Sequence, residues 1–300
     1  MLMSEFSGRA FTVSKRSRRL LTLHRPQRPV VVFVAGVHRS GTNMVMDVLD
    51  ASLQSDVFGE SDPRAFNNYL MRDEPVIRTL VARSRAETVV VKALHEAHKL
   101  RELMDRFAPA KAIWPVRACT DVVSSIVRRW PDYRNEIDEI AADRTAGAWR
   151  SLGMSDETYR IVRRHYRRNM DDASANALFW YCRNQLFFDQ GFATDSRVLP
   201  IAYEELVHEP ARGIARLAAF VGISATDRMR RIPHAEPPGR HAPPTLLRDV
   251  HELCSEMQKR LYDACRRRRP SARPISLPRG TAAERGESVA ATDRRRRLRP

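Results

Sequence analysis

The chain has 300 residues, and its 52 Lys and Arg outnumber its 36 Asp and Glu, which gives a formal net charge of +16 at pH 7. The excess lies at the ends: residues 1–28 hold 7 basic and 1 acidic residue and residues 266–300 hold 12 and 3, so subtracting +6 and +9 from +16 leaves +1 for residues 29–265. A near-neutral centre argues against a domain specific for nucleic acid. No apolar run approaches the roughly 20 residues that cross a bilayer, so no transmembrane segment is predicted.

The two basic ends are expected to lie outside the folded domain. Residues 266–300 are rich in Pro, Ser, Gly and Ala without apolar periodicity, which is typical of a disordered tail. The alternative is an arm that makes weak contact with an anionic surface or nucleic acid. Residues 1–28 lack the continuous apolar region of a secretory signal and are expected to be a flexible extension. Four cysteines without metal-ligand or C-x-x-C spacing favour free thiols, no metal site and a cytoplasmic location: Cys119, Cys182, Cys254 and Cys265.

The first element of the central region is a predicted strand over residues 30–36, followed by a helix over 43–53. Gly36 and Gly41 frame a G-x-x-x-x-G turn between them. Such a turn lets backbone N–H groups and the positive end of the next helix converge on an anion. The residues expected to line this phosphate-binding loop are His38, Arg39, Ser40, Gly41, Thr42 and Asn43.

The loop differs from that of nucleoside triphosphatases. Those proteins place a lysine and then Ser or Thr directly after the second glycine, whereas here the positions hold Thr42 and Asn43. The positive charge comes earlier, from Arg39. His38 lies beside Arg39 and is expected to have a structural part within the loop.

A second phosphate-binding pair is predicted further along the chain. A strand over residues 112–117 ends in Arg117, and Ser125 lies eight positions on, within a predicted helix over 119–130. A guanidinium at a strand end and a hydroxyl two turns into the next helix can converge on one phosphate.

Two more strands carry polar residues at or after their carboxyl ends. The strand over residues 88–92 ends in Lys92, where open α/β sheets bind ligands. The strand over 197–201 leads into Tyr203, which opens a Tyr-Glu-Glu-Leu block that precedes a helix over 210–221.

These four ordered segments, which span residues 30–223, resemble the sulfotransferases that use 3′-phosphoadenosine-5′-phosphosulfate (PAPS), and are closest to the tyrosylprotein or carbohydrate type and to bacterial members. The resemblance implies a P-loop-like fold, PAPS as the sulfuryl donor and no metal. It implies transfer to a hydroxyl of a small-molecule or carbohydrate acceptor. Asn43 departs from the family, which more often has Thr or Ser there.

The same resemblance assigns roles to single residues. The loop around Arg39 would bind the 5′-phosphosulfate, Arg117 and Ser125 the 3′-phosphate, and Tyr203 the nucleotide. Lys92 would contact the transferring sulfuryl group and the leaving phosphate oxygen.

Two residues are candidates for the base that takes the acceptor's proton. Glu60 lies twenty-one positions after Arg39, an offset that resembles the catalytic base of tyrosylprotein sulfotransferases. His95 follows Lys92 by three positions, whereas cytosolic sulfotransferases have a base histidine two positions after their lysine. Glu60 is preferred, although an unperturbed carboxylate is a weaker base than imidazole.

Strands and helices alternate along the chain, which predicts an α/β fold of three layers with a doubly wound, mostly parallel sheet. One domain over residues 29–265 is expected, with residues 131–172 as a helical insertion near the acceptor pocket or, alternatively, as a purely structural surface lobe. A Pro-rich loop over 224–243 could bring Arg240 to the nucleotide. Further helices are predicted over residues 96–107, 174–190 and 244–265.

Two other functions use the same kind of fold. A nucleotide-dependent kinase of the P-loop class is disfavoured by the missing loop lysine, and a non-catalytic nucleotide-binding protein would bind the donor without turnover. The acceptor and the oligomeric state stay open, since pocket loops set the former.

Overall fold

The computed structural model describes residues 28–130, 135–145, 147–234 and 243–268. Its centre is a parallel five-stranded sheet with the order β2-β5-β1-β6-β7. This order confirms the predicted α/β class and the doubly wound, parallel sheet. The strands are β1 (Val30–Val34), β2 (Ser55–Phe58), β5 (Thr88–Lys92), β6 (Ala110–Val116) and β7 (Val198–Ala202).

The sheet is apolar on both faces, as expected for strands that helices cover on both sides. Val32 and Phe33 point to opposite faces of β1 and are both fully buried. The central strand β1 pairs with β5 and β6, so that Val34 lies opposite Lys92 on one side and Ile113 on the other. The carboxyl ends of these three strands therefore meet at one edge.

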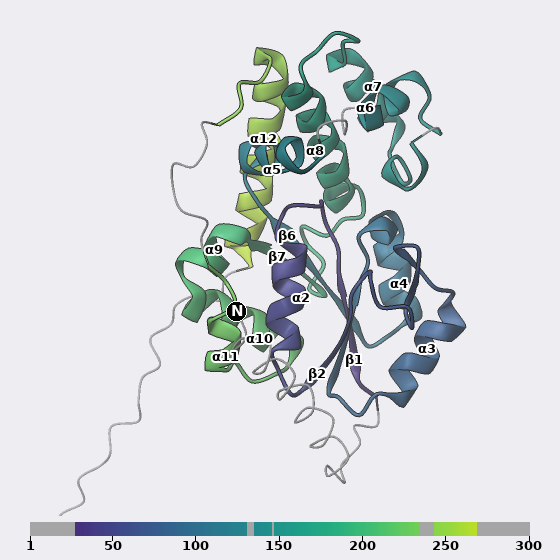
Figure 1. The fold of residues 1–300 in the computed structure, drawn as a ribbon, viewed down its shortest axis with the longest axis vertical. Coiled ribbons are helices and arrows are strands. Elements are labelled where there is room, and N and C mark those ends of the chain that lie inside the picture. Colours follow the sequence, from purple (N-terminus) through teal and green to yellow (C-terminus); the bar gives the residue numbers. More distant parts are fainter. Residues whose placement is uncertain (1–27, 131–134, 146, 235–242, 269–300) are drawn as a thin grey trace, which may run out of the picture. The chain divides into compact units, whose positions relative to one another are not determined.

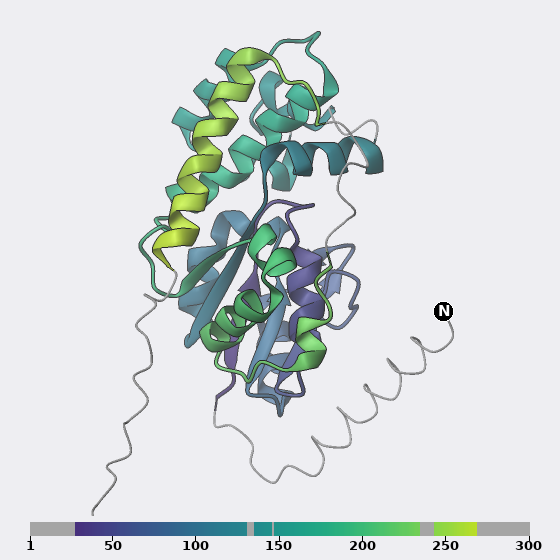
Figure 2. The ribbon, with the colours of Figure 1, turned by 90° about the vertical axis from the view of Figure 1, so that its left-hand side faces the viewer.

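Two groups of helices form the outer layers (Figure 1). One face of the sheet packs against α2 (Thr42–Asp50), α10 (Pro210–Val221) and α11 (Asp227–Arg230). The other face packs against α3 (Glu74–Arg83), α4 (Leu100–Arg106), α5 (Cys119–Arg129), α8 (Asp172–Asp189) and α12 (Arg248–Arg267). Figure 2 shows α12 running beside α8, and the two helices contact each other.

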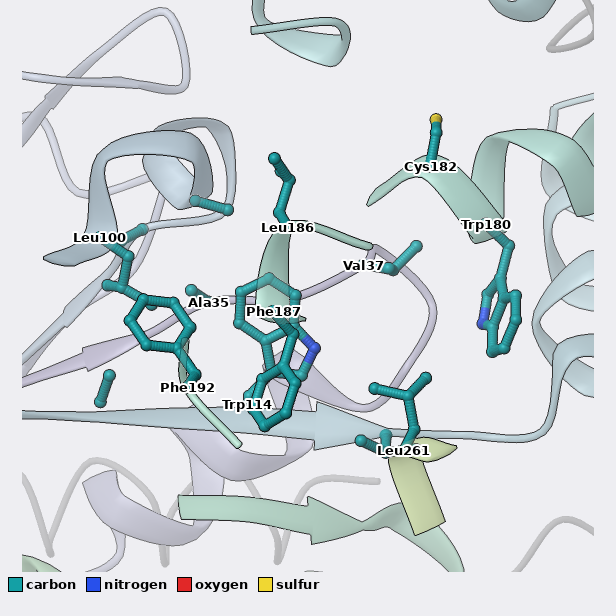
Figure 3. Packing of buried hydrophobic residues seen from close by; sticks show 14 of the residues in the cluster. Ala35, Val37, Leu100, Trp114, Trp180, Cys182, Leu186, Phe187, Phe192 and Leu261 are labelled. Carbon is teal, nitrogen blue, oxygen red and sulfur yellow. The ribbon is translucent and has the colours of Figure 1, made fainter. Parts of the chain in front are cut away.

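The core between the sheet and α8 is aromatic. Trp114 of β6 lies against Phe187 of α8, with ring centroids 5.7 Å apart, and Phe192 lies 6.0 Å from Phe187 (Figure 3). All three side chains are fully buried. Because α8 is buried along most of its length, it fixes the helices that pack around it. These helices include α6 (Asn135–Ala142) and α7 (Asp156–His165), both within residues 131–172.

Several elements differ from the sequence predictions. Residues 96–107 form a 3₁₀ helix, η1 (His95–Lys99), and then α4, and the last helix α12 begins at 248 and continues two residues past the predicted domain end at 265. The predicted loop over 224–243 contains the short helix α11. The unpredicted elements are β2, α3, α9 (Tyr203–His208) and the hairpin of β3 (Phe66–Asn67) and β4 (Leu70–Met71).

Two further findings concern single features of the described part of the chain. All four cysteines are buried thiols outside any disulfide of the described residues, as the sequence predicted. No helix in the described ranges is both long enough and apolar enough to cross a membrane.

Candidate functional site

A pocket of about 900 Å³ lies at the carboxyl edge of the sheet. Its walls come from the turn between β1 and α2, the residues at or after the ends of β2, β5 and β6, and the start of α9. The sequence-predicted residues that line it are His38, Arg39, Gly41, Thr42, Asn43, Glu60, Lys92, His95, Arg117 and Tyr203. Two others, Ser40 and Ser125, are buried but are not among the lining residues, and Arg240 lies outside the described residues.

The turn between β1 and α2 has the backbone of an anion cradle. Gly36 and Gly41 have φ values of +137° and +94°, and Arg39 has φ +65°, which is unusual for a residue with a side chain. Gly41 caps α2, and a Cβ atom there would lie 2.7 Å from Cδ2 of Tyr203. The first N–H groups of α2 have no acceptor within the helix. A helix start of this kind binds an anionic group.

Arg39 and Arg117 are tied together next to this turn. The Nε of Arg39 donates to Oγ of Ser125 at 2.8 Å, and Arg117 donates to the carbonyl oxygen of Arg39 at 3.3 Å. The Arg117 guanidinium also lies 4.3 Å from the ring centroid of Tyr203. Residues from three separate motifs therefore form one contact network.

Lys92 is held on the opposite side of the turn. Its Nζ donates to Oδ1 of Asn43 at 2.7 Å and to Oε2 of Glu60 at 2.5 Å. Glu60 reaches Lys92 because β2, which ends at Phe58, pairs with β5. The amide oxygen of Asn43 accepts a bond from a cation here, which gives this departure from the family pattern a local structural reason.

His95 lies on η1 and borders the same pocket. Its ring centroid is 4.1 Å from that of Trp149, and burial lowers the pKa of His95, so the neutral imidazole dominates at pH 7. Trp149 is itself fixed by the buried Arg183, which donates to the carbonyl oxygens of Trp149 and Leu94, both at 3.1 Å. One buried guanidinium thus joins the 3₁₀ helix η2 (Ala148–Arg150), which carries Trp149, to Leu94 just before η1.

His38 borders the pocket but is largely buried among aromatic side chains. Its ring lies 5.2 Å from Phe179 and 5.8 Å from Trp130. Burial, with smaller contributions from Arg183, Arg150 and other nearby positive groups, lowers the pKa of His38 to about 3. The imidazole is therefore neutral at pH 7.

Sequence reasoning missed several residues that line the pocket. Trp149 and Arg150 follow α6 in a stretch without apolar periodicity, and the aromatic content of residues 131–172 was the only signal for Trp149. Tyr69 lies in the unpredicted β3–β4 hairpin, and Trp130 directly follows α5. The whole set of pocket residues without a specific sequence prediction is Asn68, Tyr69, Leu70, Leu94, Arg129, Trp130, Trp149 and Arg150.

The fold and this site define a doubly wound α/β protein with a glycine turn of the phosphate-binding kind at the carboxyl edge of its sheet. The sequence model of the sulfotransferase domain matches residues 29–237. The chain therefore belongs to the sulfotransferase family, which is a family of transferases that generally use PAPS and act on hydroxyl acceptors.

Solved structures with a similar chain course are also sulfotransferases. The sulfotransferase domain of the Synechococcus PCC 7002 olefin synthase is 14% identical, with 78% of this chain and 97% of that chain covered and a TM-score of 0.47. The sulfotransferase domain from the curacin biosynthetic pathway is 14% identical, with 78% of this chain and 98% of that chain covered and a TM-score of 0.48. The sulfotransferase from Alicyclobacillus acidocaldarius is 16% identical, with 80% of this chain and 97% of that chain covered and a TM-score of 0.45. No curated protein sequence matches the chain.

Proposed function

We propose that this protein transfers the sulfuryl group of PAPS to a hydroxyl of a small-molecule or carbohydrate acceptor. The observation that carries the proposal is the position of three cations. Arg39, Lys92 and Arg117 lie at or after the carboxyl ends of β1, β5 and β6, which are neighbours in the sheet, and all three line one pocket. A donor with a 5′-phosphosulfate and a 3′-phosphate needs such a group of positive charges.

The geometry of the turn fits the donor. The absent side chain at Gly41 lets the Tyr203 ring approach the start of α2, and Arg39 supplies positive charge beside that helix start. Arg117 would hold the 3′-phosphate, Ser125 would orient Arg39 through the bond that its hydroxyl accepts, and Tyr203 would contact the nucleotide. When bound, PAPS supplies a sulfuryl group on a phosphate leaving group.

Lys92 has the right bonding capacity for charge stabilisation. An ammonium group has three N–H donors, and Asn43 and Glu60 accept two of them. The third donor can stabilise the negative charge that develops on the transferring group and the leaving oxygen. Lys92 would thus act in the transition state while Asn43 keeps it in place.

Glu60 is the proposed base. Its Oε2 accepts from Lys92, so the carboxylate lies within one hydrogen bond of the proposed transfer site and its Oε1 can take the proton of the acceptor hydroxyl. His95 is the alternative, since its lowered pKa keeps the imidazole able to accept a proton. Trp149 packs on the His95 ring at 4.1 Å, which favours a packing role for this histidine.

A nucleotide assay tests the proposal. Calorimetry should show binding of adenosine 3′,5′-bisphosphate and much weaker binding of ATP, and labelled sulfate should pass from PAPS to a component of a metabolite extract. Stronger binding of ATP would favour a kinase of the P-loop class. Bisphosphate binding without transfer to any extract component would favour a non-catalytic nucleotide-binding protein.

A further inference from the structure

The β3–β4 hairpin has an unusual residue at its tip. Asn67 pairs with Leu70, so the turn consists of Asn68 and Tyr69 alone. Both have positive φ values, +47° and +64°, which is the signature of a type I′ turn. Glycine is the favoured residue at the second position of this turn, and a tyrosine there strains the backbone.

The hairpin is fastened on both sides of its tip. The N–H of Met71 donates to Oε1 of the buried Glu96 at 2.9 Å, and the N–H of Arg72 donates to the carbonyl oxygen of Ala65 at 2.9 Å. Phe66 is buried in the core. Glu96 follows His95 on η1, so the hairpin is attached to the element that borders the proposed acceptor site. These contacts hold the strained turn in one position.

The strained tip presents apolar side chains to solvent beside the pocket. Five large hydrophobic residues of the described ranges are exposed, and three of them line this pocket: Tyr69 (59% exposed), Leu70 (48%) and Trp130 (37%). Exposed apolar side chains gathered at the mouth of a pocket mark a contact with a ligand. The cations of the pocket suit the phosphates of the donor, and the ring centroid of Trp130 lies 5.8 Å from the Arg39 guanidinium. Tyr69 and Leu70 come instead from the hairpin that is fastened to η1, the element that carries His95.

We propose that Tyr69 is a specificity-determining residue that packs its ring on an acceptor with a rigid, flat apolar face next to the hydroxyl. An aryl ring and a pyranose ring share this chemistry, and both stack on aromatic side chains. The inference rests on the proposed function of the pocket. It gives the strained tyrosine a reason, since glycine would make the same turn without strain but would contact nothing.

Substitutions at position 69 separate the ring from the strain. Tyr69→Phe keeps the ring, Tyr69→Ala removes the ring and keeps the strain, and Tyr69→Gly removes both. Leu152→Ala is the control, because Leu152 is another large exposed hydrophobic residue (48%, against 59% for Tyr69) and does not line the pocket. The probes are 2-naphthol for the aryl class and methyl β-D-glucopyranoside for the pyranose class, with the full-length protein saturated with adenosine 3′,5′-bisphosphate.

Loss of the ring is expected to weaken probe binding, and relief of the backbone strain is expected to raise the melting temperature. Tyr69→Ala and Tyr69→Gly weaken binding of one probe by about fivefold or more, while Tyr69→Phe and Leu152→Ala stay within about twofold of the wild type. Tyr69→Gly melts about 2–4 °C above Tyr69→Ala, since it relaxes the turn. The probe that responds identifies the class of acceptor, and the bisphosphate Kd stays unchanged in all variants.

The proposal is overturned if the wild type binds neither probe, or if Tyr69→Ala binds both as the wild type does. A weakened bisphosphate affinity in Tyr69→Ala also overturns it, because the ring would then belong to the donor site. Failure of the proposed function would give a different result, because the wild type itself would then bind no bisphosphate and transfer no label from PAPS.

Discussion

Arg39 links the two halves of the proposed donor site. Its side chain bonds Ser125, its carbonyl oxygen accepts from Arg117, and its φ of +65° directs the turn toward α2. The residues proposed to bind the 5′-phosphosulfate and the 3′-phosphate are therefore in direct contact with one another. Loss of either arginine is expected to affect the binding of the whole nucleotide.

Removal of either arginine should weaken donor binding. Arg39→Ala and Arg117→Ala are each expected to lower the affinity for adenosine 3′,5′-bisphosphate by about tenfold or more, because a charge-assisted bond is worth ~1.5–3 kcal/mol. Isothermal calorimetry measures this. Arg212→Ala is the control, since Arg212 is exposed and pairs with Glu209 away from the pocket. Wild-type affinity in both folded pocket variants would remove the assignment.

Replacement of the proposed base should affect turnover and leave donor binding intact. Glu60→Gln keeps the shape of the side chain and loses its basicity, so kcat is expected to fall by about 10²–10⁴-fold with little change in bisphosphate affinity. His95→Ala is the matched variant on the same pocket. Near-normal turnover of Glu60→Gln together with an inactive His95→Ala would assign the base to His95.

His38 should make the stability of the protein depend on pH. Its pKa is about 3 in the folded state, below the ordinary value of 6.5, so between these values the unfolded chain binds more protons. The free energy of unfolding therefore falls as the pH drops below 6.5, by up to about 1.4 kcal/mol per pH unit for this group. Urea titrations at pH values from 4 to 7 should show that the free energy of unfolding depends less steeply on pH in His38→Gln than in the wild type. An unchanged slope would mean that His38 has the same pKa in the folded and unfolded chain.

The sequence located some site residues better than others. Arg39, Lys92 and Arg117 could be placed together because each ends or closely follows an apolar strand, and the carboxyl ends of parallel strands share an edge. Tyr69 and Trp149 could not, since their positions depend on a hairpin and a turn that other elements hold in place. Glu60 was identified by resemblance alone, because the strand before it was not recognised.

At the scale of elements, the unpredicted ones are short or polar. The edge strand β2 lacks an apolar run because its first two residues are Ser55 and Asp56. Asp56 accepts a hydrogen bond from Ser84, a contact that the sequence does not indicate. Ile77 is the one buried residue of α3, which leaves little periodicity to detect. By contrast, β1 and β5 are nearly continuous apolar segments, and α8 is buried along most of its length. Contacts with the rest of the fold therefore determine the secondary structure of these segments more than their local sequence pattern does.

The contact between α8 and the sheet should be sensitive to lost volume. Phe187→Ala is expected to lower the free energy of unfolding by about 3–5 kcal/mol, because the ring is fully buried between Trp114 and Phe192. Urea unfolding measures the change. The neighbouring Phe188 is partly exposed, under Arg260, and Phe188→Ala should cost clearly less. Equal losses for the two variants would contradict this account of the core.

At the scale of the molecule, most of the positive charge of the sequence lies outside residues 29–265. Residues 29–265 carry a net charge of only +1 out of +16. The last helix nevertheless extends past residue 265, and the carbonyl oxygen of Cys265 accepts a bond from the buried Arg216. The proposed domain end therefore belongs a few residues later than the sequence indicated.

A shortened chain tests this boundary. Residues 28–268 are expected to fold with the melting temperature and bisphosphate affinity of the full chain, because the sheet and its covering helices lie within them. A chain that ends at residue 247 should not fold, since it lacks the buried residues of α12, which include Val250, Met257 and Leu261. Calorimetric melting distinguishes the two. An unfolded 28–268 chain would show that the basic ends are part of the domain.

The parallel sheet gives the molecule a polarity that matters for handling it. All five strands begin at one edge, where Val30 donates to the carbonyl oxygen of Glu87, and end at the other, where the pocket lies. A five-residue strand separates the edges by about 16 Å. In the shortened chain 28–268, a linker attached at residue 28 joins the protein at the edge away from the pocket. Immobilisation of the protein on a resin through that linker would therefore leave the mouth of the pocket open to the surrounding liquid.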